Sequence, residues 1–255
     1  MIVSHRHRFI FLHCRKAAGS SIAAALAPHL GPDDVHLGTW PEALEAGVRP
    51  NPRAWRDLAH PAAAISFAGR WLRRPGRWAR RAHVVDALNG AQRLKYRRAL
   101  GFSPEHAHAD RVRAWAPDAW QDYFKFCFVR NPFDRAVSDY VWRTRKTGAG
   151  DLTFRAFLEC MRDREFSHPA IPRHFDNWPI YTIDDRIAVD FVGRFERLEH
   201  DLQAVFAQLG LPKPALGRAK AMARDRDWRR WYGPAERQRV ERLFAREIET
   251  FDYGF

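Results

Sequence analysis

The fold is decided by the stretch Phe9-Ile10-Phe11-Leu12-His13-Cys14-Arg15-Lys16-Ala17-Ala18-Gly19-Ser20-Ser21-Ile22. Its first four residues are apolar and rich in aromatic rings, which favours a short buried strand over a helix. Ser20 and Ser21 precede strong helix formers and predict the N-cap of a helix. Such a helix points free backbone N–H groups and the positive end of its dipole into the loop, beside the Lys16 ammonium. The stretch therefore predicts a strand, a loop suited to an anion, and a helix.

This loop differs from the phosphate-binding loop of nucleoside triphosphatases. In that loop Gly-Lys directly precedes Ser or Thr, whereas here Lys16 lies ahead of Gly19 and no glycine opens the turn. We therefore disfavour a nucleoside triphosphatase. Two interpretations remain open for the loop taken by itself: a cradle for phosphate or sulfate, and an ordinary buried β-α turn with a solvated lysine.

A second stretch, residues 124–140, repeats the same order of elements. Its first six residues, Phe-Lys-Phe-Cys-Phe-Val, predict a strand with Arg130 at its carboxyl end. Pro132 ends that strand, and a helix follows from about Asp134 with Ser138 one turn inside it.

Ligands of open α/β sheets lie at the carboxyl ends of the strands. We therefore expect Lys16 and Ser20 from the first stretch, and Arg130 and Ser138 from the second, to converge on one anionic ligand. The predicted fold class is α/β, with a central parallel sheet flanked by helices.

The two stretches resemble the donor-binding motifs of sulfotransferases that use 3'-phosphoadenosine 5'-phosphosulfate (PAPS). The first is similar to the phosphosulfate loop, Pro-Lys-Thr-x-Gly-Thr-Ser, and the second to the 3'-phosphate motif, Val-Arg-Asn-Pro-x-Asp-Arg followed by Ser. Residues 190–198 resemble the Gly-x-Phe-Glu-x-Leu segment of the bacterial and Golgi-type carbohydrate branch, family 2, and residues 232–255 resemble its closing helix and tail. No similarity is visible between about Gly38 and Pro104.

This resemblance implies a P-loop-like sulfotransferase fold and a set of donor-binding residues. The set is Arg15, Lys16, Ala18, Gly19, Ser20, Ser21, Arg130 and Ser138. Lys16 is also expected to be catalytic, because its ammonium stabilises the negative charge that grows on the bridging oxygen as the 3',5'-bisphosphate (PAP) leaves, without a metal. The loop departs from the family pattern at Arg15, where proline is usual, and at Ala17, which lacks the threonine hydroxyl.

Two histidines are candidates for the general base that removes the acceptor proton. They are His106 and His108 in the segment Glu-His-Ala-His-Ala-Asp, whose spacing resembles both the His-x-x-Ala segment of bacterial members and the His-x-His of uronyl 2-O-sulfotransferases. Histidine suits the role because its unperturbed pKa lies near neutrality. We slightly favour His106, and the alternative is that both are surface histidines.

The acceptor side is assigned by resemblance to a loop rich in proline and aromatic residues, residues 167–179. Arg173 and His174 are the candidates for acceptor binding there, although a lone histidine in a loop is often simply solvated. The acceptor itself is expected to be a hydroxyl group on a carbohydrate or glycolipid.

The region without family similarity, about residues 38–104, is expected to be a helical insertion in a single domain that spans residues 1–255. Its part from Arg70 to Arg98 is strongly basic. Apolar residues spaced so that one or two helices bury them include Trp71, Leu72, Leu94 and Tyr96, with the arginines outside. Those outward residues are Arg73, Arg74, Arg77, Arg80, Arg81, Arg93, Lys95, Arg97 and Arg98. The basic face is either simply solvated, or it contacts an acidic acceptor or a membrane surface.

The composition fits one globular domain with an anionic partner. The chain has 255 residues and a formal net charge of +13, yet it lacks the sequence signatures of RNA-binding modules, so we expect no nucleic-acid partner. Its three cysteines lie far apart and predict neither a disulfide framework nor a zinc site. We expect a cytoplasmic protein, and a contact with the inner face of the membrane remains open.

These observations predict a PAPS-dependent sulfotransferase. Two alternatives are kept. A nucleotide-dependent kinase of related fold requires a Gly-Lys-Ser/Thr loop and a magnesium-binding acid, neither of which is found. A basic polyanion-binding protein with a degenerate donor site is expected to bind no PAP.

Overall fold

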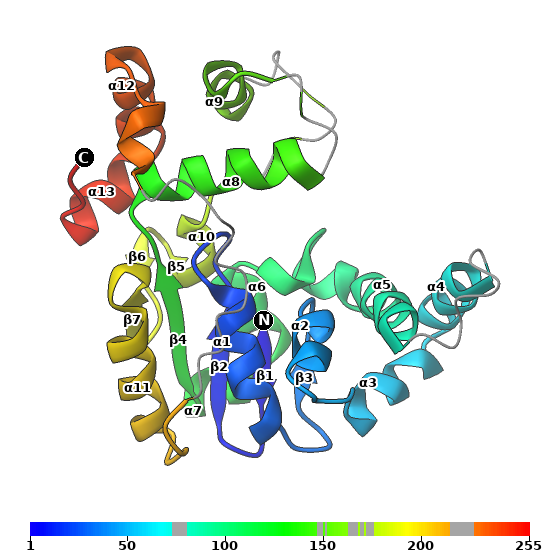
Figure 1. Cartoon of the computed structure of the whole chain (residues 1–255). Helices are drawn as coiled ribbons and strands as arrows, with labels where there is room; N and C mark the ends of the chain where they lie inside the picture. Colours follow the sequence, from blue (N-terminus) through cyan, green and yellow to red (C-terminus); the bar gives the residue numbers. More distant parts are fainter. Residues whose placement is uncertain are drawn as a thin grey trace. The chain divides into compact units, whose positions relative to one another are not determined.

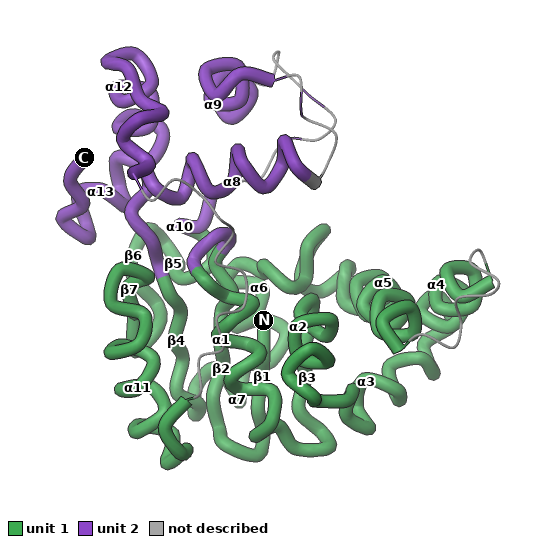
Figure 2. Tube along the Cα trace, viewed as in Figure 1, with its two compact units in different colours: residues 1–14, 18–128, 179–220 green, residues 15–17, 129–178, 221–255 purple. Residues whose placement is uncertain are grey.

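The structure is a computed structural model that describes residues 1–72, 81–146, 150, 152–162, 168, 171, 176–214 and 227–255. The chain divides into two compact units, and each is described by itself (Figure 2). The first unit contains residues 1–14, 18–128 and 179–220, and the second contains residues 15–17, 129–178 and 221–255. The expectation of a single sulfotransferase domain stays a prediction.

The first unit is built on a five-stranded sheet with strand order β3-β1-β2-β4-β7 (Figure 1). The strands are β1 (Ile2–Ser4), β2 (Phe9–Leu12), β3 (Val35–His36), β4 (Phe124–Val129) and β7 (Phe191–Arg194). The strands that precede the two predicted loops, β2 and β4, pair in parallel, whereas β1 is antiparallel to both β2 and β3. The predicted α/β class, with a central sheet flanked by helices, is confirmed; the sheet is parallel at its β2–β4 pair and antiparallel where β1 joins it.

Aromatic side chains hold the centre of this sheet together. Phe9 and Phe11 of β2 pack on Phe126 of β4, with ring centroids 5.8 and 5.2 Å apart, and all three are almost fully buried. On the other side of β4, a Cβ added to Gly193 of β7 lies 2.4 Å from Phe128 Cε1. The glycine in the Gly-x-Phe-Glu segment is therefore required for β7 to lie against this ring.

The sequence missed β1, because a three-residue strand has no readable period. Its position depends on Asp34, which accepts hydrogen bonds from Ser4 Oγ (2.6 Å) and from the backbone N–H groups of His5 (2.8 Å) and Arg6 (3.1 Å). These contacts hold the turn between β1 and β2, where Arg8 has a positive φ of 52°.

Helices account for most of the remaining first unit. They are α1 (Gly19–Leu26), α2 (Trp40–Glu45), α3 (Pro52–Arg56), α4 (Pro61–Leu72), α5 (Arg81–Leu100), α6 (Ala109–Trp115), α7 (Pro117–Asp122) and α11 (Leu198–Gln208). The short helix α10 (Trp178–Tyr181) precedes a small sheet of β5 (Thr182–Ile183) and β6 (Arg186–Ile187). Gly210, at φ +64°, follows the end of α11.

The insertion is helical and is tied together by the buried carboxylate of Asp57. Its oxygens accept hydrogen bonds from Gln92 Nε2 (2.9 Å), Lys95 Nζ (2.6 Å) and Tyr96 OH (3.0 Å), all on α5. An ion pair with Arg53 (3.2 Å) adds to them. The fully buried Asp57 is thus satisfied by donors from both sides.

The expected burial of one apolar stripe in the insertion is wrong in part. Val85, Leu88 and Tyr96 are buried, but Trp71 and Leu72 are 40% and 69% exposed. Leu94 is also exposed, because α5 faces α2 and α3 with the side that carries the buried residues. The predicted outward residues Arg73, Arg74, Arg77 and Arg80 lie outside the described residues.

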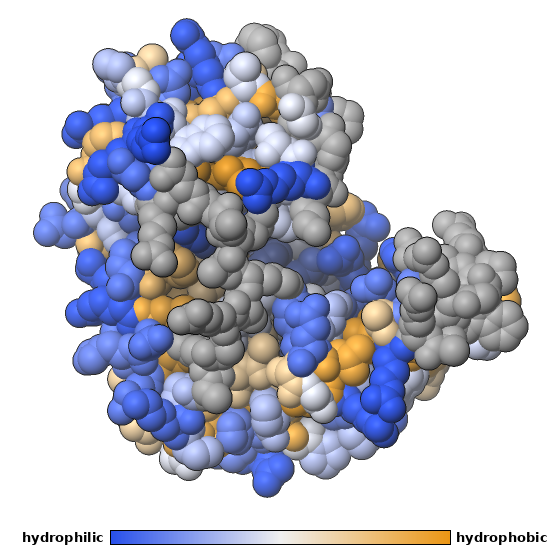
Figure 3. Space-filling view, in the orientation of Figure 1, coloured by the Kyte–Doolittle hydropathy of each residue, from blue (hydrophilic) through white to orange (hydrophobic). Residues whose placement is uncertain are grey.

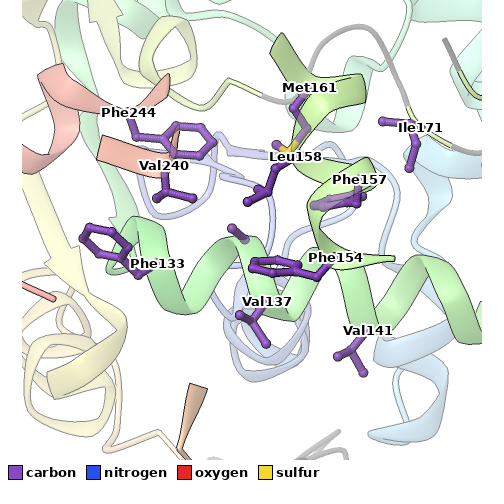
Figure 4. Packing of buried hydrophobic residues seen from close by; sticks show 11 residues of the cluster. Phe133, Val137, Val141, Phe154, Phe157, Leu158, Met161, Ile171, Val240 and Phe244 are labelled. Carbon is purple, nitrogen blue, oxygen red and sulfur yellow. The ribbon is translucent and has the colours of Figure 1, made fainter. Parts of the chain in front are cut away.

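The second unit is a helical cluster with its own apolar core (Figure 4). Its helices are α8 (Pro132–Lys146), α9 (Phe154–Arg162), α12 (Pro234–Leu243) and α13 (Ala245–Phe251). The one closing helix expected within residues 232–255 is two helices, because the chain breaks at Phe244 (φ −123°), whose ring is buried in the core. Across the described parts of both units, no helix is long and apolar enough to cross a membrane.

Candidate active site

The predicted anion loop contains two residues with backbone strain. Lys16 and Ala18 have φ values of 62° and 61°, in the left-handed region that residues with a Cβ avoid. Each costs on the order of 1 kcal/mol and persists only where the surroundings hold it. Strain of this kind gathers at ligand-binding loops, so the loop geometry is consistent with an anion site.

Asn177 holds the main chain of the loop from within the second unit. Its Oδ1 accepts from the Arg15 N–H (2.9 Å), and its Nδ2 donates to the Arg15 carbonyl oxygen (3.0 Å). Asn177 is 1% exposed. The sequence did not single out this residue, because a side chain that bonds to the backbone 162 positions away leaves no local pattern.

Arg130 directly follows β4 and is buried. Its Nε donates to Asp134 Oδ2 (2.7 Å), and its Nη2 lies 2.6 Å from the same oxygen. Its Nη1 donates to the Lys16 carbonyl oxygen (3.1 Å) and to Ser138 Oγ (3.3 Å). The structure thus brings Lys16, Arg130 and Ser138 together, and Asp134, in the first turn of α8, orients the guanidinium.

The Lys16 side chain extends over α8. Its Nζ lies 5.2 Å from the ring centroid of Trp142, within the range of a cation–π contact. Trp142 was not a predicted site residue. Beneath the loop, a cavity of about 10 Å³ is lined by residues that include Arg15, Arg135 and Asp139. It holds about one water, so it is a packing gap and not a nucleotide pocket.

In the first unit, the loop leads into α1, which begins at Gly19 and not at the predicted serines. Ala18 is at the N-cap position and makes no side-chain cap, so the prediction of Ser20 and Ser21 as caps is wrong. Both serines lie in the first turn, and Ser20 Oγ donates to Glu42 Oε1 on α2 (3.2 Å). No acidic residue lies in that first turn. The Glu42 carboxylate of α2 nevertheless reaches this turn through Ser20, so it offsets part of the positive potential at the N-terminus of α1.

His106 lies near the start of α1 through His13, which directly follows β2. A Cβ added to Gly19 would lie 1.9 Å from His13 Cδ2, so only glycine allows this ring to lie against the helix. The His13 and His106 rings pack edge to face, with their centroids 4.6 Å apart. His106 Nδ1 lies 2.7 Å from the His13 carbonyl oxygen, which can only accept. In the neutral ring Nδ1 therefore carries the hydrogen, and Nε2 has the lone pair.

The remaining predicted site residues are His108, Arg173 and His174. His108 is at the N-cap position of α6, without a side-chain cap, and its carbonyl oxygen accepts from the Val112 N–H (3.1 Å). His106 ends a short 3-10 turn, so the two histidines stand on different local structures. Arg173 and His174, the acceptor candidates, lie outside the described residues.

Comparison with known proteins places these motifs in a family. The profile of the sulfotransferase family matches residues 1–254. Human carbohydrate sulfotransferase 14 is 31% identical in an alignment that covers 60% of this chain and 43% of that protein. The mouse protein of the same name is 32% identical, over 45% of this chain and 34% of that protein.

An uncharacterised protein of Archaeoglobus fulgidus is 35% identical over 36% of this chain and 71% of its own length. The chain spans less than half the length of the human and mouse carbohydrate sulfotransferases. No solved structure matches it significantly.

Proposed function

Because this chain belongs to the sulfotransferase family, we propose that it transfers a sulfuryl group from PAPS to a hydroxyl group of a carbohydrate or glycolipid. The observation that carries the proposal is the contact of Lys16, Arg130 and Ser138, which come from the two segments that resemble the PAPS motifs. The carbohydrate sulfotransferases among the relatives support the acceptor class.

The residues around Arg130 have the chemistry that a terminal phosphate requires. Asp134 occupies the Nε and Nη2 side of the guanidinium and fixes its plane, which leaves the Nη1 edge directed at Ser138. A phosphate that replaces the Lys16 carbonyl as a partner of Nη1 gains a charge-assisted hydrogen bond, and the Ser138 hydroxyl adds a second donor. We assign the 3'-phosphate of the donor to these two residues.

Lys16 is proposed to act on the leaving group. As the bond between sulfur and the bridging phosphate oxygen breaks, the electron pair stays on that oxygen. The Lys16 ammonium stabilises the charge there, and Ser20 and Ser21 follow the loop in the first turn of α1. Removal of one such electrostatic contact costs about two to three orders of magnitude in rate.

His106 is proposed as the general base. Its Nδ1 hydrogen is directed to the His13 carbonyl oxygen, so Nε2 carries the lone pair. Nε2 takes the proton of the acceptor hydroxyl while the new bond between oxygen and sulfur forms. His13 thereby sets the tautomer of His106 and acts as a positioning residue. Arg173 and His174 remain proposed contacts of the acceptor.

The proposal is tested by incubating the protein with radiolabelled PAPS and with extracted polysaccharides, glycolipids and small glycans. Label is expected in one of these fractions, and label transfer to none of them contradicts the proposed activity. Calorimetry with PAP separates the alternative, because a polyanion-binding protein with a degenerate donor site is expected to give no heat of binding with PAP.

We also propose that the reaction takes place in the cytoplasm. The three cysteines, Cys14, Cys127 and Cys160, are not in disulfide bonds, which suits a reducing compartment. Fractionation of cells that express the protein checks this, and recovery in a secreted or luminal fraction contradicts it.

A further inference from the structure

The helix α4 exposes an apolar face. Six of its exposed residues share one side of the helix and none of the six is charged, whereas the exposed Arg70 lies on the opposite side. They are Pro61, Ala64, Ile65, Ala68, Trp71 and Leu72. Ile65 is 74% exposed and Leu72 is 69% exposed. Trp55, exposed on α3, lies against Phe67 of α4 with ring centroids 6.4 Å apart. We call this set of exposed residues, together with Trp55, the α4 patch.

The inner face of α4 explains why its apolar side is turned outward. Ala63 is fully buried, and Phe67 packs on the core formed by residues such as Val85 and Leu88 of α5. Arg70 lies across α5, because a Cβ added to Gly90 would meet its Nε at 2.3 Å. The helix thus packs on α5 with a small, mixed face and leaves its large aliphatic residues outside. The α11 helix shows the usual arrangement, with a hydrophilic visible surface (Figure 3).

The α4 patch is accompanied by a concentration of positive charge. Residues 61–100 contain ten arginines and lysines and one acidic residue, Asp86, so this segment supplies most of the net charge of +13. On α5, the described and exposed basic residues include Arg81, Arg97 and Arg98. The Arg97 guanidinium lies 4.7 Å from the ring centroid of Phe102, which is itself 69% exposed.

We infer that the α4 patch docks on the surface of an anionic phospholipid bilayer. An apolar helix face with tryptophan, beside clustered arginines, matches a helix that lies in the plane of the membrane interface. The arginines meet the lipid phosphates, and Ile65 and Leu72 enter the acyl boundary. An acidic polysaccharide is less well matched, because it offers no apolar phase to bury these aliphatic side chains. The inference goes beyond the proposed sulfuryl transfer and does not depend on it.

The test is cosedimentation of the full chain with vesicles of phosphatidylcholine alone, or of phosphatidylcholine and phosphatidylserine in equal amounts. We expect binding to the mixed vesicles only. Ile65→Ser and Leu72→Ser are each expected to weaken it about tenfold, since each removes most of the apolar surface of one buried side chain. The matched control is Ile187→Ser, at an isoleucine of β6 that is 43% exposed, and it is expected to bind as the wild type does.

Two further measurements test the contribution of the positive charge to vesicle binding. Arg97→Gln with Arg98→Gln is expected to lower binding to the mixed vesicles, and an increase of NaCl from roughly 0.1 M to roughly 0.5 M is expected to do the same. Equal binding to neutral vesicles, or wild-type binding by Ile65→Ser, overturns the inference. If Ile65→Ser and Leu72→Ser lose binding to an acidic polysaccharide while their binding to the vesicles is unchanged, the inference is overturned and the surface is assigned to the glycan. A dimer in sedimentation velocity that Ile65→Ser dissociates assigns it to a second copy of the chain.

Discussion

Replacement of Asn177 by alanine tests how the strained loop is held. The substitution removes both hydrogen bonds to the Arg15 main chain, at 2.9 and 3.0 Å, and leaves an N–H and a carbonyl oxygen in a partly buried place. A typical hydrogen bond contributes about 1 kcal/mol, and an unsatisfied buried group costs about 1–3 kcal/mol. We therefore expect Asn177→Ala to lower the free energy of unfolding by about 2–3 kcal/mol.

The same substitution is expected to lower the affinity for PAP. Without the two hydrogen bonds of Asn177, the neighbouring Lys16 can leave the left-handed conformation. PAP binding must then restore the strained loop first. A cost of about 1.4 kcal/mol in that step weakens binding about tenfold. Urea unfolding followed by tryptophan fluorescence measures the first quantity, and calorimetry with PAP measures the second.

Asn51→Ala is the matched control, because Asn51 also bonds to the main chain outside the loop. Its side chain accepts from the Ala54 N–H (3.1 Å) and donates to the carbonyl oxygens of Gly31 and Asp34, both at 2.8 Å. We expect a similar loss of stability with an unchanged affinity for PAP. If Asn177→Ala binds PAP as well as Asn51→Ala does, Asn177 does not hold the loop in the conformation that binds PAP.

Arg130→Gln and Ser138→Ala are each expected to reduce, about tenfold, the preference for PAPS over the analogue that lacks the 3'-phosphate; an unchanged preference means that neither residue reads that phosphate. His106→Ala is expected to lose more transfer than His108→Ala, to abolish the acidic limb of the pH–rate profile and to keep the affinity for PAP, whereas the reverse order assigns the base to His108. Burial lowers the pKa of His36 from 6.5 to about 3, so between these values the unfolded chain binds more protons and stability falls with the pH. The loss is about 2 kcal/mol from pH 7 to pH 5, and equal pH slopes in the unfolding of wild type and His36→Gln contradict it.

The elements that position the site were readable because their patterns are local. The strands β2 and β4 are short apolar runs followed by breakers, and both were placed correctly. The pairing of Arg130 with Asp134 was not predicted, because Arg130 precedes α8 and the pair spans the turn into the helix. The missed N-cap at Ala18 has another cause. The sequence favoured serine at that position, and the path of the loop places the serines inside the first turn of α1 instead.

The features that escaped prediction depend on contacts between distant parts of the chain. The hydrogen bonds of Asn177 to Arg15 and of His106 to His13 join residues 162 and 93 positions apart. In the insertion, the apolar spacing of Leu72 predicts burial, because on average apolar helix faces are buried. The packing of α4 on α5 through Ala63 overrides that expectation.

The release of PAP from PAPS in the presence of the acceptor fraction measures whether Lys16 supports sulfuryl transfer. Lys16→Ala is expected to lower the rate by about two orders of magnitude or more while the free energy of unfolding stays near that of the wild type. Lys213→Ala, at an exposed lysine outside the loop, is the matched control and is expected to turn over normally. Near-normal turnover of Lys16→Ala contradicts the account.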